Sequence, residues 1–260
     1  MVIEHLRATI FLVDKSEKGN LQAVYATKYS RWYTQCRCYL FDNLSYVHVL
    51  DFADSYIIPK FSYDIECSIN KKILTKKDIL AKSYSSTEKR NKVYYRAAGG
   101  GYFLLIKDTK SITYINGVLE DVKAEKEIGI NPCYNNSAVG ALLSSNLFYW
   151  NYIAYTDCRN LTKTFIDNFH IELCSCSDIE IIQCGRILFA DYEINKTRKD
   201  TYYKSTGRNV IYDEYYPKKS KKMIDKIDKA LTKHYGFTEE ELDFIINYDI
   251  KYRMGDELNE

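Results

Sequence analysis

The fold of this chain is decided by residues 139–163, which read VGALLSSNLFYWNYIAYTDCRNLTK. The first part is apolar and aromatic, and Asn135 or Asn136 can cap it as one long helix that ends near Tyr155. A turn follows that carries an acid, a guanidinium, an amide and an ammonium. We therefore expect a helix anchored in the core that holds this polar turn rigidly at the surface.

This turn supplies candidate nucleic-acid contacts at Arg159, Asn160 and Lys163. An arginine can grip guanine or a phosphate and an asparagine can grip adenine, each through two hydrogen bonds. The alternative is structural, because Asp157 could hold Arg159 in a local ion pair. Asp157 and Arg159 would then only stabilise the conformation of the loop and would not contact a ligand.

A second candidate region is rich in glycine. Residues 93–96 and 102–106 predict two strands, joined through 97–101, which include three consecutive glycines. Glycines leave no side chains in the way of a close neighbour such as a phosphate backbone, and a plain hairpin loop is the alternative. No helix follows, so the segment is not a dinucleotide-binding fingerprint. The candidate contacts here are Tyr95, Arg96, Gly99, Gly100, Gly101 and Tyr102.

Weaker candidates are Lys204, Arg208 and Asn209, which precede a short predicted strand in a loop that contains a glycine. Charge is also distributed unevenly, although the formal net charge is only +2. Residues 60–96 hold ten Lys or Arg against four acids, and residues 218–233 hold seven Lys against two acids. Such segments can follow a phosphate backbone, and solvated helix faces are the alternative.

Four more segments, taken in order with the first, resemble one known kind of protein. They are IEHLRATIFL at 3–12, YATKYSRW at 25–32, YYRAAGGGYF at 94–103 and FTEEELDFIINYDIKYRMG at 237–255. Because of these five segments and their order, the chain resembles the C-terminal target-recognition region of bacterial restriction-modification DNA adenine methyltransferases. The enzymes in question are the single-chain type II kind. Many of those enzymes also carry a restriction nuclease.

The resemblance implies double-stranded DNA as a partner and a methyltransferase catalytic domain, in cis or in trans, that binds S-adenosylmethionine. The chain itself has no glycine-rich turn for that cofactor, and Asn131-Pro132-Cys133-Tyr134 departs from the Asn-Pro-Pro-aromatic catalytic loop. We therefore expect no cofactor and no catalytic residues within this chain. A structural or interaction remnant that no longer reads DNA is the alternative, and a small enzyme with an unrecognised site is a third hypothesis.

The predicted fold class is α+β, in three parts. Residues 1–28 are expected as a β-hairpin remnant of the methyltransferase sheet, 29–215 as the recognition domain and 216–260 as a C-terminal helical pair. Helices are also predicted at 30–41, from Thr75 to about Tyr84, at 163–169, at 178–196 and at 218–235. Gly236 should end the last of these, and Thr238 with Glu241 forms a capping box for the next.

The eight cysteines are expected to be reduced thiols in the cytoplasm, because no secretory signal or membrane-spanning segment is evident. Cys36 with Cys38 and Cys174 with Cys176 could together form a four-sulfur zinc site. The one-residue gaps are shorter than the usual two to four, and simple packing is the alternative. No metal site is therefore predicted.

Overall fold

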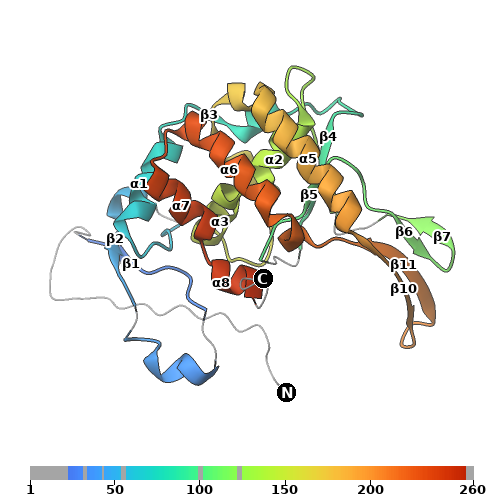
Figure 1. Ribbon diagram of the computed structural model, residues 1–260, viewed down its shortest axis with the longest axis horizontal. Coiled ribbons are helices and arrows are strands. Elements are labelled where there is room, and N and C mark those ends of the chain that lie inside the picture. Colours follow the sequence, from blue (N-terminus) through green and yellow to red (C-terminus); the bar gives the residue numbers. More distant parts are fainter. Residues whose placement is uncertain are drawn as a thin grey trace.

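A computed structural model describes residues 23–31, 34–42, 44–53, 57–98, 102–121 and 125–255, and its fold class is α+β (Figure 1). The helices are α1 (Asp64–Leu74), α2 (Asn136–Ser144), α3 (Asn146–Tyr155), α4 (Lys163–Asp167), α5 (Ile179–Asn195), α6 (Lys221–Tyr235), α7 (Glu239–Asn247) and α8 (Ile250–Met254). Short 3₁₀ helices are η1 (Thr34–Tyr39), η2 (Leu50–Phe52), η3 (Leu80–Ser83), η4 (Leu173–Ser177) and η5 (Pro217–Ser220). None of the described helices combines the length and the apolar character needed to cross a lipid bilayer.

The strands form small antiparallel sheets. They are β1 (Tyr25–Ala26), β2 (Val47–His48), β3 (Asp78–Ile79), β4 (Lys92–Arg96), β5 (Ile106–Lys107), β6 (Thr113–Ile115), β7 (Val118–Glu120), β8 (Glu125–Gly129), β9 (His170–Ile171), β10 (Thr197–Tyr203) and β11 (Arg208–Glu214). The sheet orders are β1-β2, β3-β9, β5-β4-β8 and β10-β11-β6-β7. The last sheet projects beyond the ends of α5 and α6 as an arm (Figure 1).

The core is built around α2 and α3, which pack against α5, α6 and α7. Every residue of α3 from Asn146 to Ala154 is buried, as the apolar and aromatic sequence predicts. Trp150 of α3 stacks on Phe61 with ring centroids 5.6 Å apart, and its indole N–H donates to the buried carboxylate of Glu66. Aromatic side chains bury large apolar areas, so this helix organises the rest of the fold.

The single long helix predicted from Asn135 to Tyr155 is in fact two helices. Asn135 caps α2 as expected, but Ser145 leaves the helical conformation and its hydroxyl accepts from the N–H of Phe148. The carboxylate of Asp228 on α6 accepts from the N–H groups of Asn146 and Leu147, at 3.1 and 3.0 Å. A helix N-terminus leaves such donors without intrahelical partners, so Asp228 makes the break possible inside the core.

A buried arginine completes this junction. The guanidinium of Arg253 on α8 donates to the side-chain oxygen of Asn146 at 2.7 Å and to the carbonyl of Tyr102 at 2.9 Å. The same guanidinium lies over the rings of Phe103 and Tyr149. Burial lowers the pKa of Arg253, but the nearby rings and carboxylates support its charged form. The C-terminal helices are thereby joined to the start of α3.

Glycine allows α2 and α5 to pack closely. A Cβ added at Gly185 on α5 would meet the carbonyl oxygen of Ser137 on α2, closer than real Cβ atoms approach a backbone. A Cβ at Gly140 on α2 would meet the ring of Phe189 on α5. These two positions therefore set the separation of the helices, in the way small residues do at close crossings.

Several local predictions need correction. Thr75 ends α1 and does not begin a helix, and β3 with η3 follows it. The helix predicted at 30–41 is only the 3₁₀ helix η1 among the residues described there. Residues 1–22 of the β-hairpin predicted at 1–28 lie outside the described residues. The predictions of α4, α5, the stop at Gly236 and the capping box at Thr238 are confirmed.

We expect Asp228→Ala to destabilise the protein at neutral pH by at least ~2 kcal/mol, because it leaves buried donors at the start of α3 without an acceptor. Urea unfolding followed by circular dichroism measures this loss. Asp243→Ala is the control, since Asp243 is an exposed carboxylate on α7 and its removal should change stability by less than ~0.5 kcal/mol. Equal losses in the two variants would contradict the proposed role of Asp228.

The stability that Asp228 provides should depend on pH. Burial raises the pKa of this carboxyl to about 6, although hydrogen bonds from Leu147 and Asn146 act to lower it. Its pKa in an unfolded chain is ~3.9, so the native state binds more protons between about pH 4 and pH 6. Stability must therefore fall as pH rises through this window and level off above it.

The measurement is the difference in unfolding free energy between the wild-type protein and Asp228→Ala across that range. The advantage of the wild type should shrink by up to roughly 3 kcal/mol on going from pH 4 to pH 6, because one pKa unit corresponds to about 1.4 kcal/mol. A difference that stays constant would show that Asp228 titrates normally.

Candidate functional site

The polar loop that follows α3 is exposed and firmly held, as the sequence predicts. Thr156 caps the end of α3, and its hydroxyl donates to the carbonyl of Tyr152 at 2.7 Å and accepts from the N–H of Cys158. The ammonium of Lys60 donates to the Thr156 carbonyl at 2.6 Å. Cys158 is buried and adopts a φ of +58°, a conformation that non-glycine residues adopt only at a cost.

The ion pair between Asp157 and Arg159, which the sequence left open, is not formed. The carboxylate of Asp157 instead accepts from the backbone N–H groups of Arg159 and Asn160, at 2.9 and 3.4 Å. The guanidinium of Arg159 is exposed and has no carboxylate partner in the described part of the chain. Asp157 therefore shapes the loop through its backbone, and Arg159 remains available to a ligand.

The structure brings this loop to the end of strand β4, which leads into the glycine-rich segment. The N–H of Leu161 donates to the carbonyl of Ala97 at 3.0 Å, and Ala98 forms an antiparallel bridge with Asn160. Two segments that the sequence proposed separately thus lie side by side. The three glycines at 99–101 themselves fall outside the described residues.

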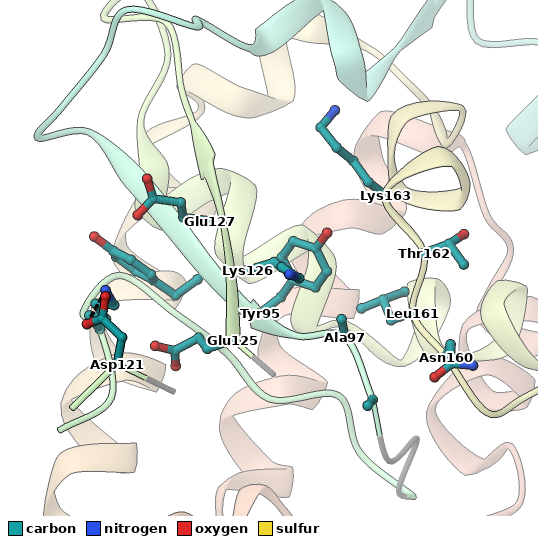
Figure 2. A pocket seen from close by; sticks show the side chains of 13 residues that line it. Tyr95, Ala97, Asp121, Glu125, Lys126, Glu127, Asn160, Leu161, Thr162 and Lys163 are labelled. Atoms are coloured by element: carbon teal, nitrogen blue, oxygen red, sulfur yellow. Dashed lines mark hydrogen bonds and ion pairs between the residues drawn. The ribbon is translucent and has the colours of Figure 1, made fainter. Parts of the chain in front are cut away.

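A cavity of about 790 Å³ lies between the loop and the sheet (Figure 2). Its lining residues are Tyr94, Tyr95, Ala97, Ala98, Lys110, Asp121, Glu125, Lys126, Glu127, Asn160, Leu161, Thr162 and Lys163. Of the candidates proposed from the sequence, the cavity therefore includes Tyr95, Asn160 and Lys163. Arg159 precedes Asn160 in the loop that forms one wall.

Acidic and basic side chains alternate along strand β8, in the sequence Glu125-Lys126-Glu127. Successive side chains of a strand point to opposite faces, so Lys126 lies on one face of β8 and the two glutamates lie on the other. Figure 2 shows Glu125, Glu127 and Asp121 on one side of the β8 ribbon, and Lys126 on the side of Asn160 and Lys163.

The carboxylates on the acidic side are all neutralised. Glu127 pairs with Lys92 at 2.6 Å and Asp121 pairs with Lys110 at 2.7 Å. Glu125 accepts from the hydroxyl and the N–H of Ser111, and the buried ammonium of Lys107 lies 3.5 Å away.

On the other side the charges are mainly positive. Lys126 makes no hydrogen bond or ion pair within the described ranges. Lys163 pairs with Asp167 at 2.8 Å and lies over the ring of Tyr84, yet more than half of its side chain is exposed. We call the three lining residues Lys126, Asn160 and Lys163, together with Arg159 beside Asn160 in the same loop, the basic face of the cavity.

Two tyrosines proposed from the sequence are engaged in structural contacts. Tyr95 is only 3 % exposed and belongs to the hydrophobic core, so its ring cannot act as an open stacking platform. Tyr102 is 42 % exposed, but the guanidinium of Arg31 lies 4.6 Å from its ring centroid. Arg96 lies opposite Glu125 in the sheet, and therefore on the other face from Lys126.

The remaining candidates lie on the projecting arm. Lys204 is in the turn of the β10–β11 hairpin, whereas Arg208 and Asn209 belong to strand β11 and not to the loop that the sequence predicts. The N–H of Asn209 donates to the side chain of Asn116, between β6 and β7. None of the three residues lines the cavity.

Sequence reasoning missed Lys126 and Lys110, because the short strands between residues 106 and 129 were not predicted. The alternation at 125–127 was a usable signal, but only once a strand was known there. The proposed four-cysteine site does not form among the described residues. Cys174 is exposed whereas Cys176 is buried, so the two thiols occupy different environments.

We expect Arg159→Ala and Asp157→Ala to affect stability independently. Arg159→Ala should change the unfolding free energy by less than ~0.5 kcal/mol, because the exposed guanidinium supports little packing. Asp157→Ala should cost ~1 kcal/mol, since it removes the acceptor for two loop N–H groups.

A double-mutant cycle measured by urea unfolding tests this independence. The two losses should add to within ~0.5 kcal/mol. Asp157→Asn is the control, because an amide oxygen can still accept these bonds and should preserve most of the stability. A larger coupling energy would mean that Asp157 and Arg159 do pair in solution.

Comparison with known proteins yields no match, whether to family models, to curated proteins or to solved structures. The functional interpretation of the chain therefore depends on the geometry of this site and on the sequence resemblance described above.

Proposed function

We propose that this chain is a DNA-recognition module that contacts a duplex through the basic face of the cavity. The observation that carries the proposal is the exposed pair Arg159 and Asn160, held on a loop whose backbone is fixed from both sides. Recognition of base edges requires side chains placed with little freedom, and Arg and Asn are the residues that read guanine and adenine. The positive φ of Cys158 supports this role, because strained backbone is common at ligand-binding positions.

The distribution of charge supports the same conclusion. Lys126 and Lys163 flank the loop on the basic face, and ammonium groups in this position suit phosphate oxygens. The carboxylates that line the same cavity lie on the opposite face of β8 from Lys126, and they are paired with Lys92, Lys110 and Lys107. A duplex approaching the basic face would therefore meet positive charge and one amide that can bind a base.

The wider biological role follows from the resemblance to adenine methyltransferases. In this proposal the chain places a DNA site so that a separate catalytic domain, with its own S-adenosylmethionine, can flip and methylate an adenine. The chain contributes binding and orientation. The methyl transfer and the extrusion of the base belong to the partner domain.

The alternative is an interaction module that does not read DNA. The observation in its favour concerns the basic segment 60–96, where ion pairs neutralise several lysines. Lys72 pairs with Glu241, Lys76 with Glu172, Lys82 with Asp78, and Lys92 with Glu127. This segment therefore offers less free charge to DNA than its composition indicates, and binding must come from elsewhere if it occurs.

Two triple variants with the same change in net charge test the proposal. Lys126→Ala/Arg159→Ala/Lys163→Ala removes the basic face, whereas Lys222→Ala/Lys226→Ala/Lys229→Ala removes an exposed lysine row on α6. Affinity for a duplex is measured by fluorescence anisotropy at several salt concentrations. We expect weaker binding only for the first variant, and a log–log salt slope smaller by about 0.9 for each phosphate that the protein no longer neutralises.

Each outcome has a defined meaning. Equal losses in both variants would show that only the overall charge matters, and a loss confined to the α6 variant would move the DNA-binding surface to that helix. A wild-type protein that does not bind duplex DNA even at low salt would favour the interaction module.

A further inference from the structure

A cluster of metal-ligating side chains lies apart from the cavity and the basic face. Glu172 and Cys174 belong to the segment that begins η4, and His234 lies near the end of α6. One donor atom from each lies within 4.8 Å of the others. The Nδ1 atom of His234 is 3.8 Å from Oε2 of Glu172, and Sγ of Cys174 is 3.9 Å from the same oxygen.

These separations are somewhat longer than the edges of a tetrahedral site, so the three side chains would move together slightly when an ion binds. Zinc binds oxygen and nitrogen at ~2.0–2.1 Å and sulfur at ~2.3 Å, so neighbouring donors around it lie roughly 3.3–3.8 Å apart. We propose that Glu172, Cys174 and His234 form a zinc site that joins η4 to the C-terminal end of α6. The donor set, a carboxylate, a thiolate and an imidazole, is one that Zn²⁺ accepts.

The imidazole is already oriented for this role. Nε2 of His234 lies 3.2 Å from Oδ2 of Asp178, which turns Nδ1 toward Glu172. Metal-bound histidines commonly donate their second nitrogen to a carboxylate, and this contact fixes the ring and its tautomer. Asp178 is itself fixed, because it caps α5 and accepts from the N–H groups of Glu180 and Ile181.

The surrounding charges suit a divalent cation. Oε1 of Glu172 pairs with the ammonium of Lys76 at 2.7 Å, which leaves Oε2 for the metal. The carboxylates of Glu172 and Asp178 lie beside His234, and Lys76 pairs with Glu172, so a bound dication would add positive charge where two carboxylates meet. The ion pair between Glu172 and Lys76 alone does not explain why the Cys174 thiol and the His234 imidazole lie beside the same carboxylate.

Three protein ligands leave one position of a tetrahedral ion for water or another small ligand. A cavity of about 400 Å³ adjoins Glu172 and Cys174 and is otherwise lined by residues 75–78 and Leu173. The neighbouring thiol of Cys176 is not part of the site, because it is buried and does not belong to the group of donors that lie within 4.8 Å of one another. Only the exposed member of the Cys174-x-Cys176 pair is therefore placed to bind zinc.

Calorimetry on the full chain, stripped with a chelator and titrated with Zn²⁺ alone, tests the proposal. We expect one saturable site per chain and at least about tenfold weaker binding in Cys174→Ser and in His234→Gln. Asp178→Asn should weaken binding by ~10–100-fold, as loss of an outer carboxylate does, while asparagine still caps α5. Cys36→Ser is the matched control, since it removes an exposed thiol outside the cluster and should bind zinc as the wild type does.

Two further measurements separate this site from binding by scattered thiols. Co²⁺ in place of zinc should give a thiolate charge-transfer band that disappears in Cys174→Ser, and circular dichroism should show that this variant is folded. Zinc should also raise the melting temperature of the wild type and of Cys36→Ser only, because binding to the native state stabilises it. Unchanged zinc affinity in Cys174→Ser or His234→Gln, equal losses in Cys36→Ser, or no saturable binding by the wild type would overturn the proposal.

Discussion

One carboxylate in the core, that of Asp228, holds the central helix in place. It lies 3 % exposed and accepts from the first backbone N–H groups of α3 and from the side chain of Asn146. Without an acceptor there, α3 could not begin inside the core, since buried backbone donors must be paired. The position of Trp150, the aromatic contacts of α3 and the direction of the loop after it all depend on where this helix starts.

The sequence predicted those parts of the fold whose signals are local. The stop at Gly236 and the capping box from Thr238 to Glu241 each lie within a few residues, and both are confirmed. The break at Ser145 was not predicted, because Ser145 offers only a local cap and the second acceptor, Asp228, is 82 residues away on α6. Helix α1 was missed for a similar reason, since its capping residue is Tyr63 and Glu66 is held by Trp150 from a distant helix.

The parts of the candidate site that depend on local sequence were also predicted, whereas those that depend on strand pairing were not. The exposure of Arg159 and Asn160 follows from an apolar helix that ends in a polar turn, which is a local pattern. The contact of this loop with Ala97 and the place of Lys126 depend on pairing between β4 and β8, which no local pattern specifies. Tyr95 shows the converse, because aromatic residues beside a glycine-rich segment suit a binding surface and a core equally well, and only packing decides between them.

The guanidinium of Arg253 has a practical consequence for anyone who shortens the chain. It binds the carbonyl of Tyr102, just after the glycine segment, and the side chain of Asn146 at the start of α3. A truncation before Arg253 would remove only a short tail in sequence, yet it would disconnect two elements more than a hundred positions upstream. Expression variants should therefore carry purification tags on a spacer beyond Gly255 and keep α8 intact.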